Sequence, residues 1–271
     1  MSWSAERYVA FEDERTRPAR DLLAAIPRAQ VAVAIDLGCG PGNSTELIAA
    51  RFPEARITGI DSSADMVAAA RARLPAARFE IADVRAWALR ARAVRASADD
   101  AGAGSQAANL VFANAVLQWV PGHAELFPAL ASRLCPGGWL AVQVPDNLDE
   151  PAQKLMREIA DDGPWRQKLA NADGSRVRIE SAAWYYRLLR DSCSRVDVWR
   201  TTYHHPLAGP DAIVEWFKGT GLLPFLAPLD SVERADYLVR YTRAIERAYP
   251  TSSDGTVLLP FPRLFIVANR H

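Results

Sequence analysis

The stretch Asp36-Leu37-Gly38-Cys39-Gly40-Pro41-Gly42-Asn43 decides the fold expected for this 271-residue chain. It follows an apolar run, residues 31–37, which predicts a buried strand. It precedes residues 44–52, which predict a helix with Asn43 as its N-cap and Glu46 three residues later. A strand, a glycine turn and a helix open an α/β domain that binds a nucleotide-like ligand, because glycine lets the backbone approach where a Cβ would collide.

The rest of the chain alternates between strand and helix patterns. Strands are predicted at residues 57–60, 78–82, 110–113, 139–144, 196–203 and 261–268, with Pro262 suiting a strand start. Helices are predicted at 63–74, 125–134, 151–162, 182–191, 212–219 and 232–248, and a turn at 136–138. This order predicts a doubly wound, seven-stranded, mostly parallel α/β sheet whose last two strands pair antiparallel at one edge.

Composition excludes several classes of function. Lys plus Arg and Asp plus Glu both total 32, so the zero net charge implies no attraction to nucleic acid or to a membrane surface. Cys39, Cys135 and Cys193 are scattered, without a disulfide framework or metal spacing. His204 and His205 are adjacent on a predicted strand and point to opposite faces, which disfavours a metal pair. An acidic N-terminus and no apolar run near ~18 residues indicate a cytoplasmic protein without signal peptide or membrane span.

Acidic residues end three successive predicted strands. Asp36 ends the first strand, and Asp61 ends the second about 20 residues beyond the glycine turn, where dinucleotide folds place an acid on the ribose hydroxyls. The alternative for Asp61 is an exposed helix cap, since Ser62-Ser63 follow. Asp83 ends the third strand, where its carboxylate can accept from an adenine amine while the Val84 N–H donates to a ring nitrogen. Three such acids together favour a ligand site over a coincidence of loop acids.

The turn also indicates the charge of the ligand. The G-x-G-x-x-G pattern requires a glycine at position 43, which is Asn, and no lysine is placed for a pyrophosphate. Acids around a pyrophosphate would repel it, whereas a cationic ligand would be attracted. The carbonyls of Gly38 and Asn114, at strand ends beside the turn, are placed to accept from an ammonium group. Met66 is expected either against an adenine face or in the core.

The acid-x-G-x-G-x-G pattern resembles motif I of the class I, Rossmann-like S-adenosylmethionine-dependent methyltransferases. From Trp3 nearly to its end the chain is similar to the trans-aconitate methyltransferases, in residues 14–19, 36–44, 57–63, 112–115, 117–119, 143–147, 199–203 and 261–268. The resemblance implies methyl transfer from S-adenosylmethionine to a trans-aconitate carboxylate, giving a monomethyl ester and S-adenosylhomocysteine. The cofactor-binding residues are then expected to be Asp36, Gly38, Gly40, Asp61, Ser62, Met66, Asp83, Val84 and Asn114.

We expect one methyltransferase domain over residues 1–271, built from three parts. Residues 1–28 form an N-terminal extension, with a helix that opens at 15–18 and runs to Ile26. Residues 29–145 form the cofactor-binding core, and residues 146–271 supply a helical cap, inserted between the last strands, and the antiparallel edge strands. Residues 88–108 lack apolar periodicity and predict a solvated insert at the opposite edge from the ligand. The insert is longer than this family usually carries, and Asn109 replaces an acid common before the fourth strand.

The implied acceptor explains the lack of a catalytic acid–base set. A carboxylate with a pKa near 4 is ionised at neutral pH, so the reaction needs alignment of the acceptor oxygen, methyl carbon and sulfur rather than a general base, and no metal. Arginine matches carboxylates because its planar fork meets two oxygens. Substrate-binding candidates are Arg15, Arg17, Arg200 and Arg263, with Trp119 and Tyr203 as pocket walls. For each arginine the alternative is a salt bridge, and for Trp119 it is core packing.

The sequence leaves two other functions open. The chain is alternatively a methyltransferase for another small molecule, or a module that holds S-adenosylmethionine without turnover. The intact glycine motif and the apolar cap favour turnover. Methylation of nucleic acid is disfavoured by the zero net charge and by the absence of an Asn/Asp-Pro-Pro-aromatic motif.

Overall fold

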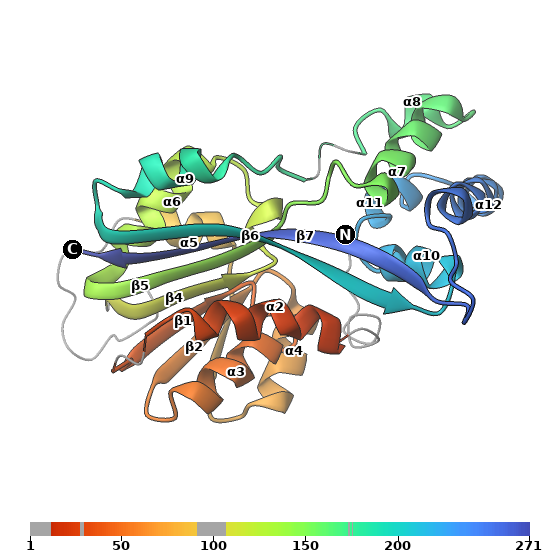
Figure 1. Cartoon of the computed structure of the whole chain (residues 1–271). Coiled ribbons are helices and arrows are strands. Elements are labelled where there is room, and N and C mark those ends of the chain that lie inside the picture. Colours follow the sequence, from red (N-terminus) through yellow and green to blue (C-terminus); the bar gives the residue numbers. More distant parts are fainter. Residues whose placement is uncertain (1–11, 28–29, 91–106, 173, 175) are drawn as a thin grey trace. The chain divides into compact units, whose positions relative to one another are not determined.

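The computed structural model describes residues 12–27, 30–90, 107–172, 174 and 176–271 (Figure 1). The strands are β1 (Val33–Leu37), β2 (Arg56–Asp61), β3 (Arg78–Ile81), β4 (Ala108–Asn114), β5 (Leu134–Pro145), β6 (Cys193–Leu207) and β7 (Val257–Arg270). The helices are α2 (Glu12–Ala24), α3 (Asn43–Arg51), α4 (Ala64–Arg73), α5 (Val84–Leu89), the short η1 (Leu117–Trp119), α6 (His123–Ser132), α7 (Pro151–Asp162), α8 (Arg166–Leu169), α9 (Ala182–Leu189), α10 (Pro210–Lys218), α11 (Leu223–Leu226) and α12 (Ser231–Ala248).

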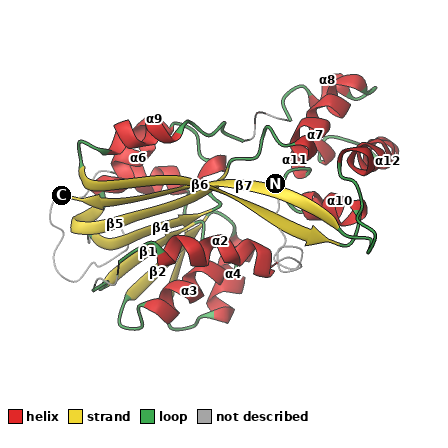
Figure 2. Ribbon diagram, in the orientation of Figure 1, coloured by secondary structure: helices red, strands yellow, loops and turns green. Residues whose placement is uncertain are grey.

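The seven strands form one sheet in the order β3-β2-β1-β4-β5-β7-β6, which confirms the predicted α/β fold (Figure 2). β1 pairs in parallel with β2 and β4, and β3 and β5 extend the parallel part on either side. Leu37, at the end of β1, lies opposite Ile60 of β2 and Ala113 of β4. The carboxyl ends of β1, β2 and β4 therefore meet at one edge, where open parallel sheets bind their ligands.

β6 and β7 run antiparallel, as predicted. The His271 N–H donates to the Ser192 carbonyl at 3.4 Å, and the Ser194 hydroxyl donates to the Asn269 carbonyl at 3.3 Å. Residue numbers thus rise on one strand as they fall on the other. β6 forms the edge, while β7 lies between β5 and β6.

Helices cover both faces of the parallel part of the sheet (Figure 1). α2 packs against α3, and α4 packs against β2 and β3, on one face. α5, α6 and α9 pack together on the other face, over a core that includes Leu37, Leu126 and Tyr185. The burial of apolar side chains on both faces explains why β1 and β4 are nearly continuous apolar runs.

The chain divides into two compact units. One unit contains the described residues of 3–144 together with 179–200 and 264–271, and so holds the glycine turn and β1–β5. The other contains 145–178 and 201–263, and so holds α7, α8, α10, α11 and α12 with the remaining parts of β6 and β7. In the second unit α12 packs against α7 and α10. There Tyr237 donates to the Met156 carbonyl at 2.8 Å, a bond that joins α12 to α7.

Three local predictions at the ends of elements are wrong. Asn43 is the first residue of α3 rather than its cap, because Gly42, at φ 96°, leads the chain into the helix and its carbonyl accepts from the Glu46 N–H at 2.9 Å. α2 begins at Glu12, so Pro18 lies inside the helix and not in its opening turn, at the cost of one backbone hydrogen bond. Pro262 lies within β7 rather than at its start; its carbonyl still accepts from the Asp146 N–H at 2.9 Å.

Two further predictions differ from the structure in where an element begins or ends. Residues 136–138, predicted as a turn, lie within β5, where Gly137 has φ +75° and the pairing with β4 shifts register. α5 was not predicted, so residues 88 and 89 of the expected insert are helical, because Asp83 caps the helix and Trp87 buries its apolar face. Residues 91–106 of that insert lie outside the described residues. Within the described part of the chain, no helix is long and apolar enough to cross a membrane.

Candidate functional site

Hydrogen bonds to β2 fix the glycine turn that follows β1. The N–H groups of Gly38 and Cys39 both donate to the Ile60 carbonyl, at 2.7 and 3.1 Å. Gly38 and Gly40 have φ +64° and +54°, in the left-handed region that side chains disfavour. A Cβ on Gly38 would collide with Val116 at 2.4 Å, whereas a Cβ on Gly40 would meet nothing within 4 Å. Gly38 is therefore needed for packing, and Gly40 leaves backbone open to a ligand.

Asp61, at the end of β2, ties this turn to the next helix. Its Oδ2 accepts from the Gly40 N–H at 3.0 Å, and its Oδ1 accepts from the Ser63 N–H at 2.9 Å. The cap of α4 is Ser63, whose hydroxyl accepts from the Met66 N–H at 3.4 Å. Asp61 thus does not cap α4 itself. Each carboxylate oxygen has a second lone pair, so the half-buried group still has capacity to accept from a ligand hydroxyl.

Asp36 lies beneath the turn and is completely buried. Its Oδ2 accepts from the hydroxyls of Ser44 and Thr45, at 2.7 and 2.6 Å, while among the described residues its Oδ1 has no hydrogen-bond partner. Burial raises the pKa of Asp36 to about 7; the two hydroxyls lower it and the charge of Asp61 raises it further. The anionic form of this carboxyl therefore requires a compensating positive charge nearby.

The remaining cofactor candidates lie at the same edge of the sheet. Asp83 caps α5, with its Oδ1 accepting from the Ala86 N–H at 2.7 Å, and Val84 is the first residue of that helix. The first N–H groups of a helix have no partner within the helix, so the Val84 N–H keeps the donor role predicted for it. Ser62 is exposed, and Met66 is buried in the first turn of α4. Asn114 ends β4, and its Oδ1 is buried without a hydrogen-bond partner among the described residues.

The substrate candidates fall in both units. In the first, Arg17 is exposed on α2, Trp119 is half-buried in η1 and Arg200 is exposed on β6; the side chain of Arg15 lies outside the described part. In the second, Arg263 is buried, with its guanidinium 5.9 Å from the centre of the Tyr203 ring and 4.6 Å from that of Phe261. Arg263 and Tyr203 therefore lie in contact with each other.

Two buried hydrogen-bonded groups were not predicted from the sequence. Ser44 and Thr45 hold Asp36, and the run Asn43-Ser44-Thr45 directly after the glycine turn was the available signal. His123, at the start of α6, is buried between the Tyr185 hydroxyl, 2.7 Å from Nδ1, and the Leu117 carbonyl, 2.9 Å from Nε2. Burial lowers the pKa of His123, so the neutral ring joins η1, which carries Trp119, to α9. No local pattern marks that contact.

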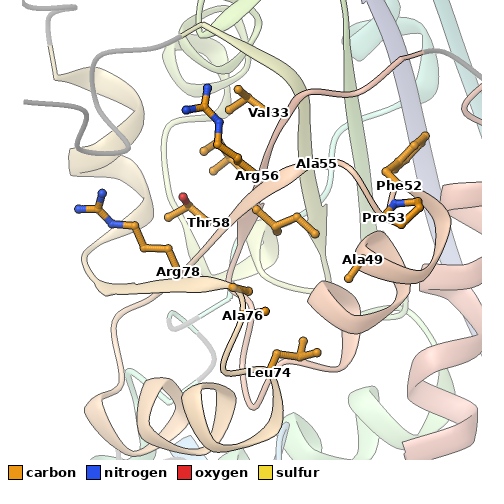
Figure 3. Close-up of a pocket in the computed structure, with 13 residues that line it drawn as sticks. Val33, Ala49, Phe52, Pro53, Ala55, Arg56, Thr58, Leu74, Ala76 and Arg78 are labelled. Carbon is orange, nitrogen blue, oxygen red and sulfur yellow. The ribbon is translucent and has the colours of Figure 1, made fainter. Parts of the chain in front are cut away.

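A cavity of about 430 Å³ lies at the opposite end of the sheet (Figure 3). Its lining comes from the starts of β1, β2 and β3 and from the ends of α3 and α4, including Ile35, Phe52, Thr58 and Leu74. None of the predicted cofactor residues lines it. This basal cavity is therefore separate from the predicted cofactor residues.

The comparisons with known proteins agree with this geometry. A family described as a methyltransferase domain matches residues 10–222. The YcgJ protein from Bacillus subtilis has a similar structure, with a TM-score of 0.57, 11% identity, and coverage of 94% of this chain and 99% of that one. Phosphoethanolamine N-methyltransferase 2 of Haemonchus contortus, solved in complex with S-adenosyl-L-methionine, gives a TM-score of 0.52 at 14% identity and covers 94% of this chain and 53% of its own. The fold is that of a class I methyltransferase.

Two relatives narrow the family. A trans-aconitate 2-methyltransferase of Methylobacterium nodulans is 54% identical over 268 residues, which span 99% of this chain and 98% of that protein. A trans-aconitate 2-methyltransferase of Rhizobium meliloti is 52% identical over 271 residues, the full length of both. The chain belongs to the trans-aconitate 2-methyltransferase family of S-adenosylmethionine-dependent enzymes. Among the described residues there is no group of three or more His, Cys, Asp or Glu side chains that could hold a metal ion.

Proposed function

We propose that this protein transfers a methyl group from S-adenosylmethionine to one carboxylate of trans-aconitate, forming a monomethyl ester and S-adenosylhomocysteine. The observation that carries the proposal is 54% identity to a trans-aconitate 2-methyltransferase across 99% of the chain. The glycine turn held by Asp61 supports it, because that turn leaves the Gly40 backbone open to a ligand. The proposed substrate is thus a small polycarboxylate. A cytoplasmic location stays a prediction.

The residues fit an adenosyl cation. Asp61 would accept from the ribose hydroxyls, Asp83 and the Val84 N–H would recognise the adenine edge, and Asn114 with Gly38 would accept from the ammonium group. Ser62 and Met66 would border the adenosine, and Gly40 would allow its close approach. The sulfonium and ammonium groups of the ligand would stabilise the ionised form of the buried Asp36 carboxyl. Bound S-adenosylmethionine supplies an electrophilic methyl group.

The acceptor needs no base from the protein. Its carboxylates are ionised at neutral pH, so the protein's part is to bind and orient them and to exclude water. Transfer of the methyl carbon to a carboxylate oxygen would form a C–O bond as the C–S bond breaks, and would turn a carboxylate and a sulfonium into a neutral ester and thioether. A dry site favours that loss of charge over the charged ground state. Arginine side chains would hold the carboxylates that do not react, because their forks donate two parallel hydrogen bonds.

Among the arginines, Arg263 has the strongest support. It is buried, and its guanidinium lies against the Tyr203 and Phe261 rings, a setting in which a cation is fixed and its attraction for a carboxylate is little screened by water. Tyr203, whose ring lies against this guanidinium, would offer a hydroxyl donor. Arg17 and Arg200 are exposed and Trp119 is half-buried, so they stay candidates for the acceptor together with Arg15.

A labelled-methyl assay tests the function. The purified protein is incubated with radiolabelled S-adenosylmethionine and, separately, with trans-aconitate, cis-aconitate, citrate and isocitrate. We expect the highest kcat/KM with trans-aconitate. Labelling of another small molecule but of none of these acids would make the protein a methyltransferase of different specificity. Binding of S-adenosylhomocysteine without any turnover would make it a binding module.

Single substitutions to Met test the acceptor site. Arg263→Met should raise the KM for trans-aconitate at least tenfold while S-adenosylhomocysteine affinity stays unchanged, since a hydrogen bond to a charged group contributes about 1.5–3 kcal/mol. Arg71→Met, an exposed change on α4, is the control for loss of an arginine. Wild-type kinetics in the Arg17, Arg200 and Arg263 variants together would show that the acceptor binds elsewhere.

A further inference from the structure

A small cavity of about 20 Å³ lies between the glycine turn and the N-terminal helix. Its lining combines the turn with α2, α3 and the end of β4: Thr16, Ala19, Gly38, Cys39, Asn43, Ser44 and Asn114. A volume of this size accommodates one water molecule or one ammonium group. The cavity lies in the first compact unit, so the fold of that unit defines it alone.

α2 presents one buried face to this cavity. Thr16 and Ala19, three residues apart, line the cavity. The buried side of the helix continues toward its end, at Leu22, Leu23 and Ile26. The opposite side, with Arg17 and Arg20, is exposed. α2 is fixed by packing against α3 and by the hydrogen bond of 2.6 Å from Arg51 to the Ile26 carbonyl. The one hydroxyl that α2 contributes to the lining of the cavity is therefore that of Thr16.

The surroundings of the cavity are rich in acceptors. The Oδ1 of Asn114, on its wall, is buried and has no hydrogen-bond partner within the described ranges. Asp36 is completely buried beside it, with Ser44 bonded to one oxygen and the other, Oδ1, equally without a partner there. Buried acceptors without a donor are costly, and a ligand that brings N–H groups removes that cost. An ammonium group has three donors and no acceptor, which matches this set.

We propose that Thr16 is a cofactor-binding residue: its hydroxyl and the Oδ1 of Asn114 hold the α-ammonium group at the amino-acid end of the methyl donor, and α2 closes the cavity over it. The proposal rests on the proposed use of S-adenosylmethionine. It changes the role of the N-terminal segment. Arg15 and Arg17 in this segment were predicted to bind the acceptor, whereas the face of α2 that is turned toward the glycine turn would bind the cofactor. A cation at this point would in turn stabilise the ionised form of Asp36.

Calorimetry with two ligands tests the assignment. S-adenosylhomocysteine carries the amino-acid end, and 5′-methylthioadenosine lacks it. Thr16→Val keeps the shape of the side chain but removes the hydroxyl. We expect Thr16→Val to weaken S-adenosylhomocysteine about tenfold and to leave 5′-methylthioadenosine affinity unchanged. Thr16→Ser, which restores the hydroxyl, should regain most of the wild-type affinity.

The control is Thr58→Val, the same chemical change at the basal cavity, which should alter neither affinity (Figure 3). Equal weakening of both ligands by Thr16→Val would assign Thr16 a purely structural role, and unchanged affinity for both would show that it does not contact the donor. Either result overturns the inference while leaving methyl transfer by the wild-type protein intact. Failure of the wild-type protein to bind S-adenosylhomocysteine would instead overturn the proposed function.

Discussion

The backbone N–H of Gly40 donates a hydrogen bond of 3.0 Å to the Oδ2 of Asp61, which joins the glycine turn after β1 to the end of β2. The two residues are 21 positions apart in the chain. The same carboxylate accepts from the Ser63 N–H, so one side chain orients both the turn and the entry to α4. Asp61 thereby shapes the donor site in the free protein as well as offering acceptors to a ligand.

Removal of this carboxylate should weaken cofactor binding strongly. Asp61→Ala deletes the acceptors proposed for the ribose and releases the Gly40 N–H, so S-adenosylhomocysteine affinity should fall by about 1.5–3 kcal/mol. Isothermal titration calorimetry measures the change. Asp65→Ala, an exposed acid in the first turn of α4, is the matched control and should bind as the wild type does. Unchanged affinity in Asp61→Ala would remove the ribose role.

Substitution of Gly40 by alanine should weaken ligand binding in addition to straining the backbone, and a second glycine shows the effect of strain alone. Gly40→Ala places a Cβ at φ +54°, which destabilises the fold by about 1–2 kcal/mol. Gly137→Ala does the same at φ +75° in β5, and a Cβ at either site meets nothing within 4 Å. We expect similar losses in the free energy of urea unfolding for both, but loss of S-adenosylhomocysteine binding only in Gly40→Ala. Equal binding by the two variants would mean that no ligand approaches Gly40.

Asp36 should make stability depend on pH. Burial raises its pKa from 3.8 to about 7, so the folded state binds the proton more tightly than the unfolded chain does. Its stabilising contribution is complete below pH 3.8 and is lost as the pH rises to about 7, a change on the order of 4 kcal/mol. Asp36→Asn, which stays neutral, should therefore gain stability relative to the wild type between pH 4 and pH 7. Urea unfolding across this range measures it, and a constant difference would contradict the assignment.

The pair His123 and Tyr185 should respond to pH in the opposite direction. Burial lowers the pKa of His123, so its contribution to stability is complete above the ordinary histidine pKa of 6.5 and is lost as the pH falls below that value. Tyr185→Phe removes the hydroxyl 2.7 Å from Nδ1 and should cost about 1–3 kcal/mol at pH 7, because a buried ring nitrogen loses its partner. Tyr186→Phe, at an exposed neighbouring position, should cost little in the same thermal unfolding experiment.

Local sequence predicted most of the parallel sheet. The apolar runs of β1 and β4, the glycine turn and the acids at the ends of β1, β2 and β3 follow from periodicity and backbone sterics over a few residues. Errors arose at short elements and at the ends of elements. α5 is short and forms because Asp83 caps it and Trp87 is buried, and β7 begins five residues before Pro262, whose carbonyl accepts from the Asp146 N–H.

The sequence by itself determined that three acids follow three strands and that a glycine turn lies between the first strand and a helix. Only the tertiary structure decided that Asp61 holds Gly40, that Ser44 and Thr45 share one oxygen of Asp36, and that Thr16 rather than Arg17 faces the turn. It also placed Arg263 among aromatic rings while leaving Arg200 exposed. The physical reason is that periodicity reports which face of an element is buried, whereas a side chain's partners depend on which other elements pack against that face.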